Sequence, residues 1–303
     1  MQSVTKRNTV LTIIGLVLLW GFSWSAIKYG LNYAPPILYA GIRTLAGGLL
    51  LLLPSLARKK QLHLRKNLPI YLISSLLNVV LFFGLQTVGL YFLPSGLLSV
   101  LVYLQPILVG FLAWLWLGES LSIAKIAGLI LGFLGVATVS FESLTGHTSL
   151  AGILIAIAAG LFWAIGTVYI KRVQGRVDML WLVSIQFIVG GIVLLAGGST
   201  VESWSSIQWN WQFFASMFYS AVFGVSLSWV MWLKLVHAGE VSRVSSYIFV
   251  VPLLSVVIGT VLLHEAFSMF LLLGLIFIAT GIYLANRPQR TRQPSSLDMK
   301  TST

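Results

Sequence analysis

The sequence predicts an all-α integral membrane protein of ten transmembrane helices, arranged as two inverted five-helix repeats. Three observations support this prediction: an apolar composition, ten long apolar stretches and a match between the two halves of the chain. Of the 303 residues, 58% are hydrophobic and only 9% are charged, whereas about a quarter of a soluble domain is charged. Lipid must therefore solvate much of the chain, and in lipid only bundled helices or a closed barrel satisfy the backbone.

Long unbroken apolar runs, such as residues 10–19 and 123–139, favour helices, and the alternating pattern of barrel strands is absent. A spanning helix needs about 20 apolar residues. The run after Lys6 and Arg7 is too long for a signal peptide and lacks a small-residue cleavage site, so we expect a retained first helix. The ten predicted helices are residues 9–29, 35–56, 69–91, 95–117, 122–141, 150–171, 178–199, 211–236, 242–263 and 268–286.

The basic residues predict the orientation of these helices. With the N-terminus inside, the inner segments contain all but two of the 19 lysines and arginines, the exceptions being Lys28 and Arg43. Because cytoplasmic loops collect Lys and Arg, both termini are expected in the cytoplasm. The same rule accounts for the net charge of +12. No nucleic-acid partner is expected, because no basic patch is interleaved with exposed aromatic residues.

The two halves of the chain match each other in sequence. Five helices per half is an odd number, so the second copy enters the membrane from the opposite side, and inverted repeats are typical of transporters with a midplane site. The expected units are residues 1–8 (cytoplasmic N-terminus), 9–141 (first repeat), 150–286 (second repeat) and 287–303 (disordered cytoplasmic tail). The matched pairs, at offsets of 143 and then 146, are Trp20 with Trp163, Lys28 with Lys171, Gly47-Gly48 with Gly190-Gly191, Ser99 with Ser245, Tyr103 with Phe249, Pro106 with Pro252 and Glu119 with Glu265.

Two motifs carry a resemblance to a known family. The first is Ala-Gly-Ile-Arg43 with Gly47-Gly48. The second is Pro106, then Leu-Gly-Glu119 and two glycines, which recurs from Pro252 with His264 in place of the loop glycine. Over residues 9–286 the chain resembles the EamA family of the drug/metabolite transporter superfamily. The resemblance implies ten helices in inverted repeats, export of amino acids or related metabolites, and a peripheral position for the helices at 122–141 and 268–286.

Arg43 is the most informative candidate residue. It lies near the middle of its helix, where a charge costs at least about 2.5 kcal/mol. Its helix neighbours at three and four positions are Ala40, Tyr39, Ala46 and Gly47, a face of mostly small residues that suits packing inside a bundle. No acidic residue lies mid-membrane to pair with Arg43, so it is either a structural anchor or a contact for substrate or gate. Lys28 is expected to snorkel to the headgroups.

Aromatic and polar side chains recur at helical spacing and predict a cavity with aromatic walls. A single tryptophan alone would be interpreted as an anchor at the membrane interface, and a single serine as a hydroxyl hydrogen-bonded to the backbone of its own helix. Such walls suit hydrophobic or aromatic amino acids. The prolines are candidate hinges, or else static kinks. Besides Arg43, the candidate substrate-binding residues are Trp20, Trp24, Asn78, Gln86, Ser99, Tyr103, Trp163, Trp229, Ser245 and Phe249, and the candidate hinges are Pro106 and Pro252.

Several absences narrow the function. The chain has no cysteine, and its four histidines form no ligand motif, so neither a metal nor another cofactor is expected. All seven acidic residues fall in loops, helix ends or the tail, which weakens the case for ion coupling. Glu119 and Glu265 are expected to be structural acids at loops. A Walker-type phosphate-binding loop is missing, so the protein is not expected to hydrolyse ATP by itself.

The sequence therefore predicts a secondary exporter of small metabolites in a bacterial-type plasma (inner) membrane, working by alternating access. Its expected partners are a small-molecule substrate and membrane lipid. The alternatives are a translocase for lipids or lipid-linked intermediates and, more remotely, a membrane-embedded transferase. An enzyme is disfavoured because such chemistry needs a cluster of His, Asp, Glu or Cys. The sequence leaves open whether the protein is a monomer or a homodimer.

Overall fold

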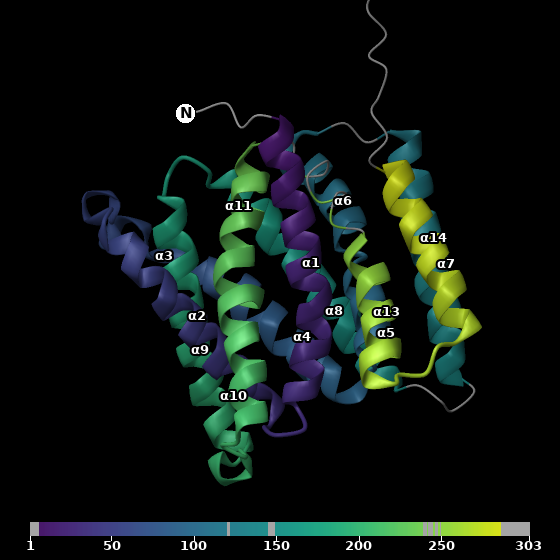
Figure 1. The fold of residues 1–303 in the computed structure, drawn as a ribbon. Helices are drawn as coiled ribbons and strands as arrows, with labels where there is room; N and C mark the ends of the chain where they lie inside the picture. Colours follow the sequence, from purple (N-terminus) through teal and green to yellow (C-terminus); the bar gives the residue numbers. More distant parts are fainter. Residues whose placement is uncertain are drawn as a thin grey trace, which may run out of the picture.

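The computed structural model describes residues 6–119, 122–144, 149–238 and 250–285, together with residues 241, 245 and 248. These residues form a bundle of helices whose long axes run roughly the same way (Figure 1). Seven helices are long and apolar enough to cross a membrane, and three shorter helices are also apolar. Within the described part there is no β-strand, only an isolated bridge between Gln174 and Val177. The fold is that of a multi-pass membrane protein.

The first half of the chain contains seven α-helices and two short helical segments of other types. The segment η1 is a 3₁₀ turn, and η2 is π-helical. In order, they are α1 (Lys6–Gly30), α2 (Pro36–Leu56), η1 (Lys59–Gln61), α3 (Leu64–Ser75), η2 (Leu76–Phe83), α4 (Gly84–Phe92), α5 (Ser95–Val102), α6 (Gln105–Leu117) and α7 (Ile123–Leu144).

The second half repeats this plan over its described residues. Its 3₁₀ turn is η3 and its π-helical segment is η4. In order, the elements are α8 (Leu150–Arg172), α9 (Met179–Val201), η3 (Trp204–Ser206), α10 (Trp211–Phe218), η4 (Tyr219–Leu227), α11 (Ser228–Ala238), α13 (Val250–Leu263) and α14 (Met269–Ala285).

Local sequence signals explain where several helices begin. Pro36 is the first residue of α2, a position where a missing backbone N–H costs nothing. The side chains of Ser149, Asp178 and Asn210 accept hydrogen bonds from the backbone of the first turns of α8, α9 and α10. These short polar side chains are typical N-caps, because their oxygens replace the carbonyl that the first turn lacks.

Two predicted helices differ in detail from the sequence-based expectation. The helix expected at 69–91 begins at Leu64 and runs through η2 into α4. The helix expected at 95–117 is divided into α5 and α6 by a turn at Tyr103 and Leu104. Pro106 is the second residue of α6, where its ring does not clash with a preceding helical turn.

The two π-helical segments occupy matched places in the two halves. Segment η2 begins at Leu76 and η4 at Tyr219, which is the same offset of 143 that relates Trp20 to Trp163. Each segment lies between two α-helical pieces of one long membrane helix. π-Helices are rare and often mark functional sites. Their occurrence at matched places in both halves therefore marks the region between η2 and η4 as a candidate functional site.

Matched helices pack directly against each other. Helix α2 lies along α9, and α14 lies along α7 at one edge of the bundle (Figure 1). Glycines permit the α2–α9 contact: a Cβ atom built on Gly191 would lie 2.6 Å from the backbone nitrogen of Leu45, and one on Gly48 would lie 2.7 Å from that of Ile188. Small residues at such crossings let the backbones approach closely, which is how helices associate in lipid.

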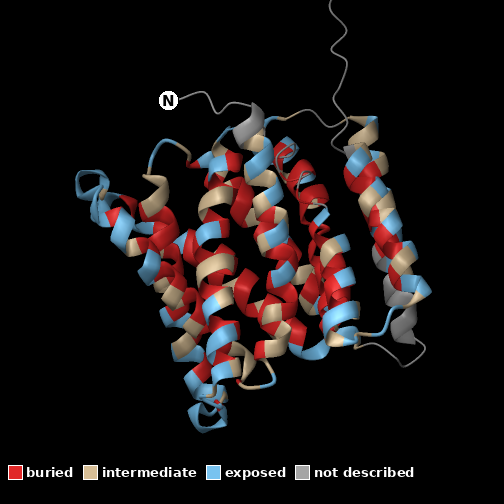
Figure 2. Ribbon diagram, viewed as in Figure 1, coloured by how far each residue is buried: buried red, intermediate tan, exposed pale blue. Residues whose placement is uncertain are grey.

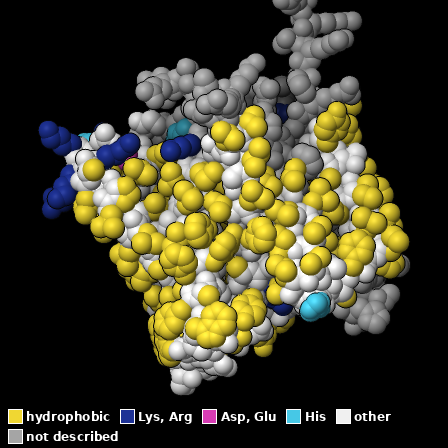
Figure 3. Space-filling model, viewed as in Figure 1, with side chains coloured by type: hydrophobic (Ala, Val, Ile, Leu, Met, Phe, Trp, Pro, Cys, Tyr) yellow, Lys and Arg dark blue, Asp and Glu magenta, His cyan; other side chains and the backbone are white. Residues whose placement is uncertain are grey.

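Burial and surface chemistry agree with this arrangement. Buried residues concentrate on the inward faces of the helices (Figure 2). The outward face in view is covered with hydrophobic side chains, and Lys and Arg gather at the end of the bundle where the chain begins (Figure 3). Large exposed side chains include Leu53, Phe133 and Val261. A surface this apolar fits a lipid environment.

The α2–α9 crossing gives a stability prediction. We expect Gly191→Ala to destabilise the protein by about 1–3 kcal/mol, because the added methyl group overlaps the backbone of Leu45. The matched control is Gly197→Ala on the same helix, where a Cβ atom meets nothing within 4 Å. The measurement is thermal unfolding of both variants in detergent. Equal melting temperatures would contradict the close approach of the two helices.

Candidate functional site

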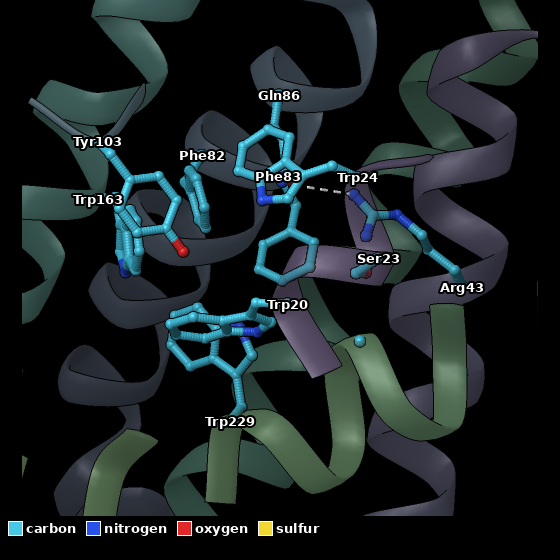
Figure 4. A pocket seen from close by; sticks show the side chains of 11 residues that line it. Trp20, Ser23, Trp24, Arg43, Phe82, Phe83, Gln86, Tyr103, Trp163 and Trp229 are labelled. Carbon is cyan, nitrogen blue, oxygen red and sulfur yellow. Dashed lines mark hydrogen bonds between the residues drawn. The ribbon is translucent and has the colours of Figure 1, made fainter. Parts of the chain in front are cut away.

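A small cavity lies at the centre of the bundle (Figure 4). Its volume, counted as the space open to the centre of a water molecule, is about 20 Å³. One water needs about 10–15 Å³ on this measure. The cavity thus has room for one or two waters, and a metabolite can enter only if the walls move apart. It is lined by both halves of the chain, through Trp20, Ser23, Trp24, Arg43, Phe82, Phe83, Gln86, Tyr103, Trp163, Gly224 and Trp229.

Trp163 is the centre of an aromatic cluster on one side of the cavity. Its ring stacks on Phe82 with the centroids 4.8 Å apart and the planes 10° from parallel. Trp20 and Tyr103 each meet it edge-on at 5.5 Å, and Trp232 lies 5.9 Å away. Such offset and edge-to-face pairs each contribute about 0.5–1.5 kcal/mol beyond their buried area. The cluster joins α1, η2, α8 and α11.

Trp229 forms a second aromatic contact beside this cluster. Its ring lies 5.7 Å from that of Phe83 and 5.2 Å from that of Phe187, the latter nearly perpendicular at 87°. Within the described residues, the indole nitrogens of Trp163 and Trp232 are buried without a hydrogen-bond partner. Of these two tryptophans only Trp163 lines the cavity, so one unused N–H donor belongs to a residue of the aromatic wall.

Arg43 provides the charge at the other side of the cavity. Its side chain is 1% exposed. Nη2 donates hydrogen bonds to Oε1 of Gln86 at 3.1 Å and to Oγ1 of Thr87 at 2.8 Å, and the guanidinium carbon lies 4.6 Å from the centroid of the Phe83 ring. Nε is buried and has no partner among the described residues. The guanidinium is thus held in place by neutral groups and keeps hydrogen-bonding capacity.

The described carboxylates lie away from Arg43, at the ends of helices. Glu265 accepts from the backbone nitrogen of Ser95 at 2.7 Å and from that of Gly96 at 3.2 Å, so it caps α5. Glu202 accepts from the first backbone nitrogens of α2 at 2.9 and 2.7 Å. Asp178 caps α9. None of the residues lining the cavity, all of which belong to the described part, is acidic. The central site therefore carries a positive charge.

Two matched lysines support the ends of the bundle. Nζ of Lys28 donates to the carbonyl oxygens of Leu90 and Leu93 at 2.5 and 3.0 Å, at the end of α4. Lys171 donates to the carbonyl oxygen of Val236 at 3.1 Å, near the end of α11. Cations stabilise helix C-termini because the last carbonyls lack partners. Lys28 was expected to reach the headgroups, and the structure instead gives it carbonyl partners within the protein.

The cavity brings together most of the aromatic residues proposed from sequence. Seven of the predicted substrate-binding residues line it, and they come from both halves. The four other lining residues, absent from the predicted set, are Ser23, Phe82, Phe83 and Gly224. The sequence did not predict Phe83, because α-helical spacing places Phe82 and Gln86 on one face and Phe83 on another. In the structure both phenylalanines of η2 line the cavity. The seven are Trp20, Trp24, Arg43, Gln86, Tyr103, Trp163 and Trp229.

The other predicted binding residues do not line this cavity. Asn78 is buried against Gly166, and its amide donates to the carbonyl oxygen of Ser74 at 3.2 Å. Ser99 donates to its own helix, to Gly96 O at 2.7 Å. Ser245 is buried, and its hydroxyl has no partner among the described residues. Phe249 lies outside the described residues.

The structure places the two candidate hinge prolines near helix starts. Pro106 is in the first turn of α6, directly after the break at Tyr103 and Leu104, and Pro252 is the third residue of α13. The bend expected within one continuous helix is thus a junction between α5 and α6. Their role as hinges stays a prediction. Across the described ranges, no three His, Cys, Asp or Glu side chains come together as metal ligands.

Comparison with known proteins identifies the family. Two stretches of the chain, residues 7–141 and 150–287, match the EamA-like transporter family. The chain belongs to the EamA-like transporter family. As in the resemblance drawn from its motifs, α7 and α14 of this EamA-like protein lie together at one edge, and none of their described side chains lines the central cavity.

Individual relatives of this EamA-like protein are also named as transporters. The uncharacterized transporter YvbV of Bacillus subtilis is 45% identical over 98% of this chain and 97% of its own length. A probable amino-acid metabolite efflux pump of Escherichia coli is 25% identical over 93% and 95%. A crystal structure with a TM-score of 0.70 and 20% identity covers 93% of this chain and 98% of that one, which shows a shared fold. The family and these names indicate a transporter rather than an enzyme.

The contact between Glu265 and α5 gives a second stability prediction. We expect Glu265→Ala to lower the free energy of unfolding by about 0.5–2 kcal/mol, because the first turn of α5 loses its cap. The matched control is His264→Gly, which keeps the positive φ of 54° at that position and leaves the carboxylate in place. Thermal unfolding in detergent measures both. A Glu265→Ala variant as stable as the control would show that the cap is dispensable.

Proposed function

We propose that this EamA-like protein is a secondary transporter that exports small metabolites, most favourably hydrophobic or aromatic amino acids, by alternating access. The site is the central cavity, and the protein lies in a bacterial-type plasma membrane with both termini in the cytoplasm. The observation that carries the proposal is a small, positively charged cavity with aromatic walls built from both halves of the chain. Carriers of this kind place one site between two repeats and expose it alternately.

The proposed architecture is ten helices in two inverted five-helix repeats, over residues 9–141 and 150–286. Three observations support it. The family matches the chain twice, once in each half. The π-helical segments recur at an offset of 143. The equivalent helices α2 and α9, and likewise α7 and α14, pack against each other, as expected for two copies related by an axis that passes between them.

The proposed substrate class follows from the walls of the cavity. Trp20, Trp163 and Trp229 present large apolar rings, while Arg43 and Gln86 supply polar contacts. Ligand sites combine mostly apolar walls with a few fixed polar groups that set orientation. One relative is named a probable amino-acid metabolite efflux pump, which agrees with this class. Substrate binding by Asn78, Ser99, Ser245 and Phe249 stays a prediction.

Counterflow tests the proposal. We expect proteoliposomes preloaded with an excess of unlabelled tryptophan, phenylalanine or leucine to accumulate the same labelled compound with no ion gradient imposed. Accumulation absent from protein-free liposomes would establish a carrier. If no amino acid exchanges while fluorescent lipid analogues move between leaflets in a protein-dependent way, the protein is a lipid translocase and the proposal is wrong.

A substitution in the aromatic cluster tests whether the cavity selects the substrate. We expect Trp163→Ala to change the relative rates of counterflow for aromatic and aliphatic amino acids by several fold, because its ring touches Phe82, Trp20 and Tyr103. The matched control is Trp114→Ala, whose ring is 40% exposed on the outside of the bundle. An unchanged preference in Trp163→Ala would remove the aromatic cluster from the selectivity site.

A further inference from the structure

The polar side of the cavity has hydrogen-bonding capacity that the protein does not use. A guanidinium has five N–H donors and no acceptor. The hydrogen bonds that Arg43 donates to Gln86 and Thr87 both start from Nη2, and Nε is buried without a partner among the described residues. Arg43 itself lines the cavity in which a small molecule would bind.

The charge of Arg43 is also unbalanced in its surroundings. The acidic side chains whose contacts the structure gives are engaged at helix ends: Glu202 and Glu265 cap helices, Asp178 pairs with Arg58, and Glu119 pairs with Lys125 at 3.7 Å. Around the guanidinium, Gln86 and Thr87 supply neutral oxygens, and Phe83 supplies a ring face. An anion entering the cavity would therefore gain a fully desolvated cationic partner.

A positively charged group of a ligand has no carboxylate partner among the residues that line the cavity. A substrate ammonium group would meet ring faces, which attract cations more weakly than a carboxylate does. It would also stand in the field of Arg43, which repels it. The rings of Trp163, Phe82 and Trp20 suit the apolar part of a molecule whose charged end lies at Arg43.

We propose that Arg43 binds the carboxylate of the transported molecule, and that this carboxylate, not an amino group, is the charged group required for binding. This inference rests on the proposed function, because it takes the cavity to be the transport site. The ligand class is an aromatic or branched aliphatic monocarboxylate. Amino acids and their counterparts without the amino group both belong to it, while the corresponding amines do not.

Three compounds with one side chain test the proposal on the wild-type protein. They are phenylalanine, 3-phenylpropanoate and 2-phenylethylamine, titrated against the intrinsic tryptophan fluorescence of the purified protein in nanodiscs. Four of the eleven tryptophans line the cavity, and we expect their fluorescence to change when it is occupied. We expect saturable binding of both carboxylates, with 3-phenylpropanoate at least as tight as phenylalanine, because it has no ammonium group beside the carboxylate that must be desolvated. We expect no binding of the amine up to about 10 mM, tenfold above the usual upper range of KM.

Two results would overturn the proposal. One is an affinity for 2-phenylethylamine equal to or greater than that for the carboxylates. The other is no saturable binding of 3-phenylpropanoate over the same range of concentration. Neither result depends on a variant, so misfolding of a mutant cannot obscure the answer.

Substitutions assign the effect to Arg43. We expect Arg43→Gln to weaken binding of 3-phenylpropanoate at least about tenfold, the loss of one charge-assisted hydrogen bond. Arg43→Lys keeps the positive charge but loses the planar guanidinium with its paired N–H donors. We therefore expect this variant to bind 3-phenylpropanoate with intermediate affinity. The matched control is Gln186→Met, at the position equivalent to Arg43 in the second half, which is equally buried but does not line the cavity. Equal affinity in Arg43→Gln and Gln186→Met would contradict the proposal.

Counterflow separates the failure of this inference from the failure of the proposed function. If 3-phenylpropanoate binds in an Arg43-dependent manner but no amino acid exchanges across the membrane, the carboxylate site stands and amino-acid transport fails. If phenylalanine exchanges and 2-phenylethylamine competes with it as well as 3-phenylpropanoate does, transport stands and the carboxylate requirement fails.

Discussion

Inside a membrane, the polar groups of the backbone must find their partners within the protein, and this constraint organises the rest of the structure. It requires helices for the backbone and partners for the helix ends. Glu202 and Glu265, both in the second half, cap α2 and α5 of the first half. Lys28 closes the end of α4. The halves are therefore held together by hydrogen bonds at the helix ends as well as by apolar packing along their lengths.

The same constraint makes the middle of the bundle informative, because matched positions there carry different chemistry. Trp20 and Trp163 are equivalent, and both line the cavity. Arg43, however, corresponds to Gln186, which accepts a hydrogen bond from Ser74 away from the cavity. Gln86 corresponds to Trp229. Arg43 and Gln86 thus make one side of the cavity polar, while Trp20, Trp163 and Trp229 make the other side aromatic.

Sequence patterns predicted helices well and their irregularities poorly. Composition and apolar length suffice to place spans such as α2, α8 and α9 within a few residues, because lipid leaves the backbone little choice. They do not reveal the π-helical turns or the junction between α5 and α6. Those features depend on which side chains of neighbouring helices meet, as Phe82 meets Trp163. Hence Phe83 was missed, and Asn78 was assigned to a cavity that its side chain does not line.

The sequence by itself determined that this is a helical membrane protein with a duplicated chain, and that Arg43 must lie inside the bundle. These conclusions need only transfer free energies and residue spacing. Only the tertiary structure decided which stripes converge on one cavity, that Gln86 and Thr87 hold the guanidinium, and that donors remain on it. The reason is that contacts between residues far apart in the chain depend on helix rotation and crossing, which the periodicity of a single helix does not fix.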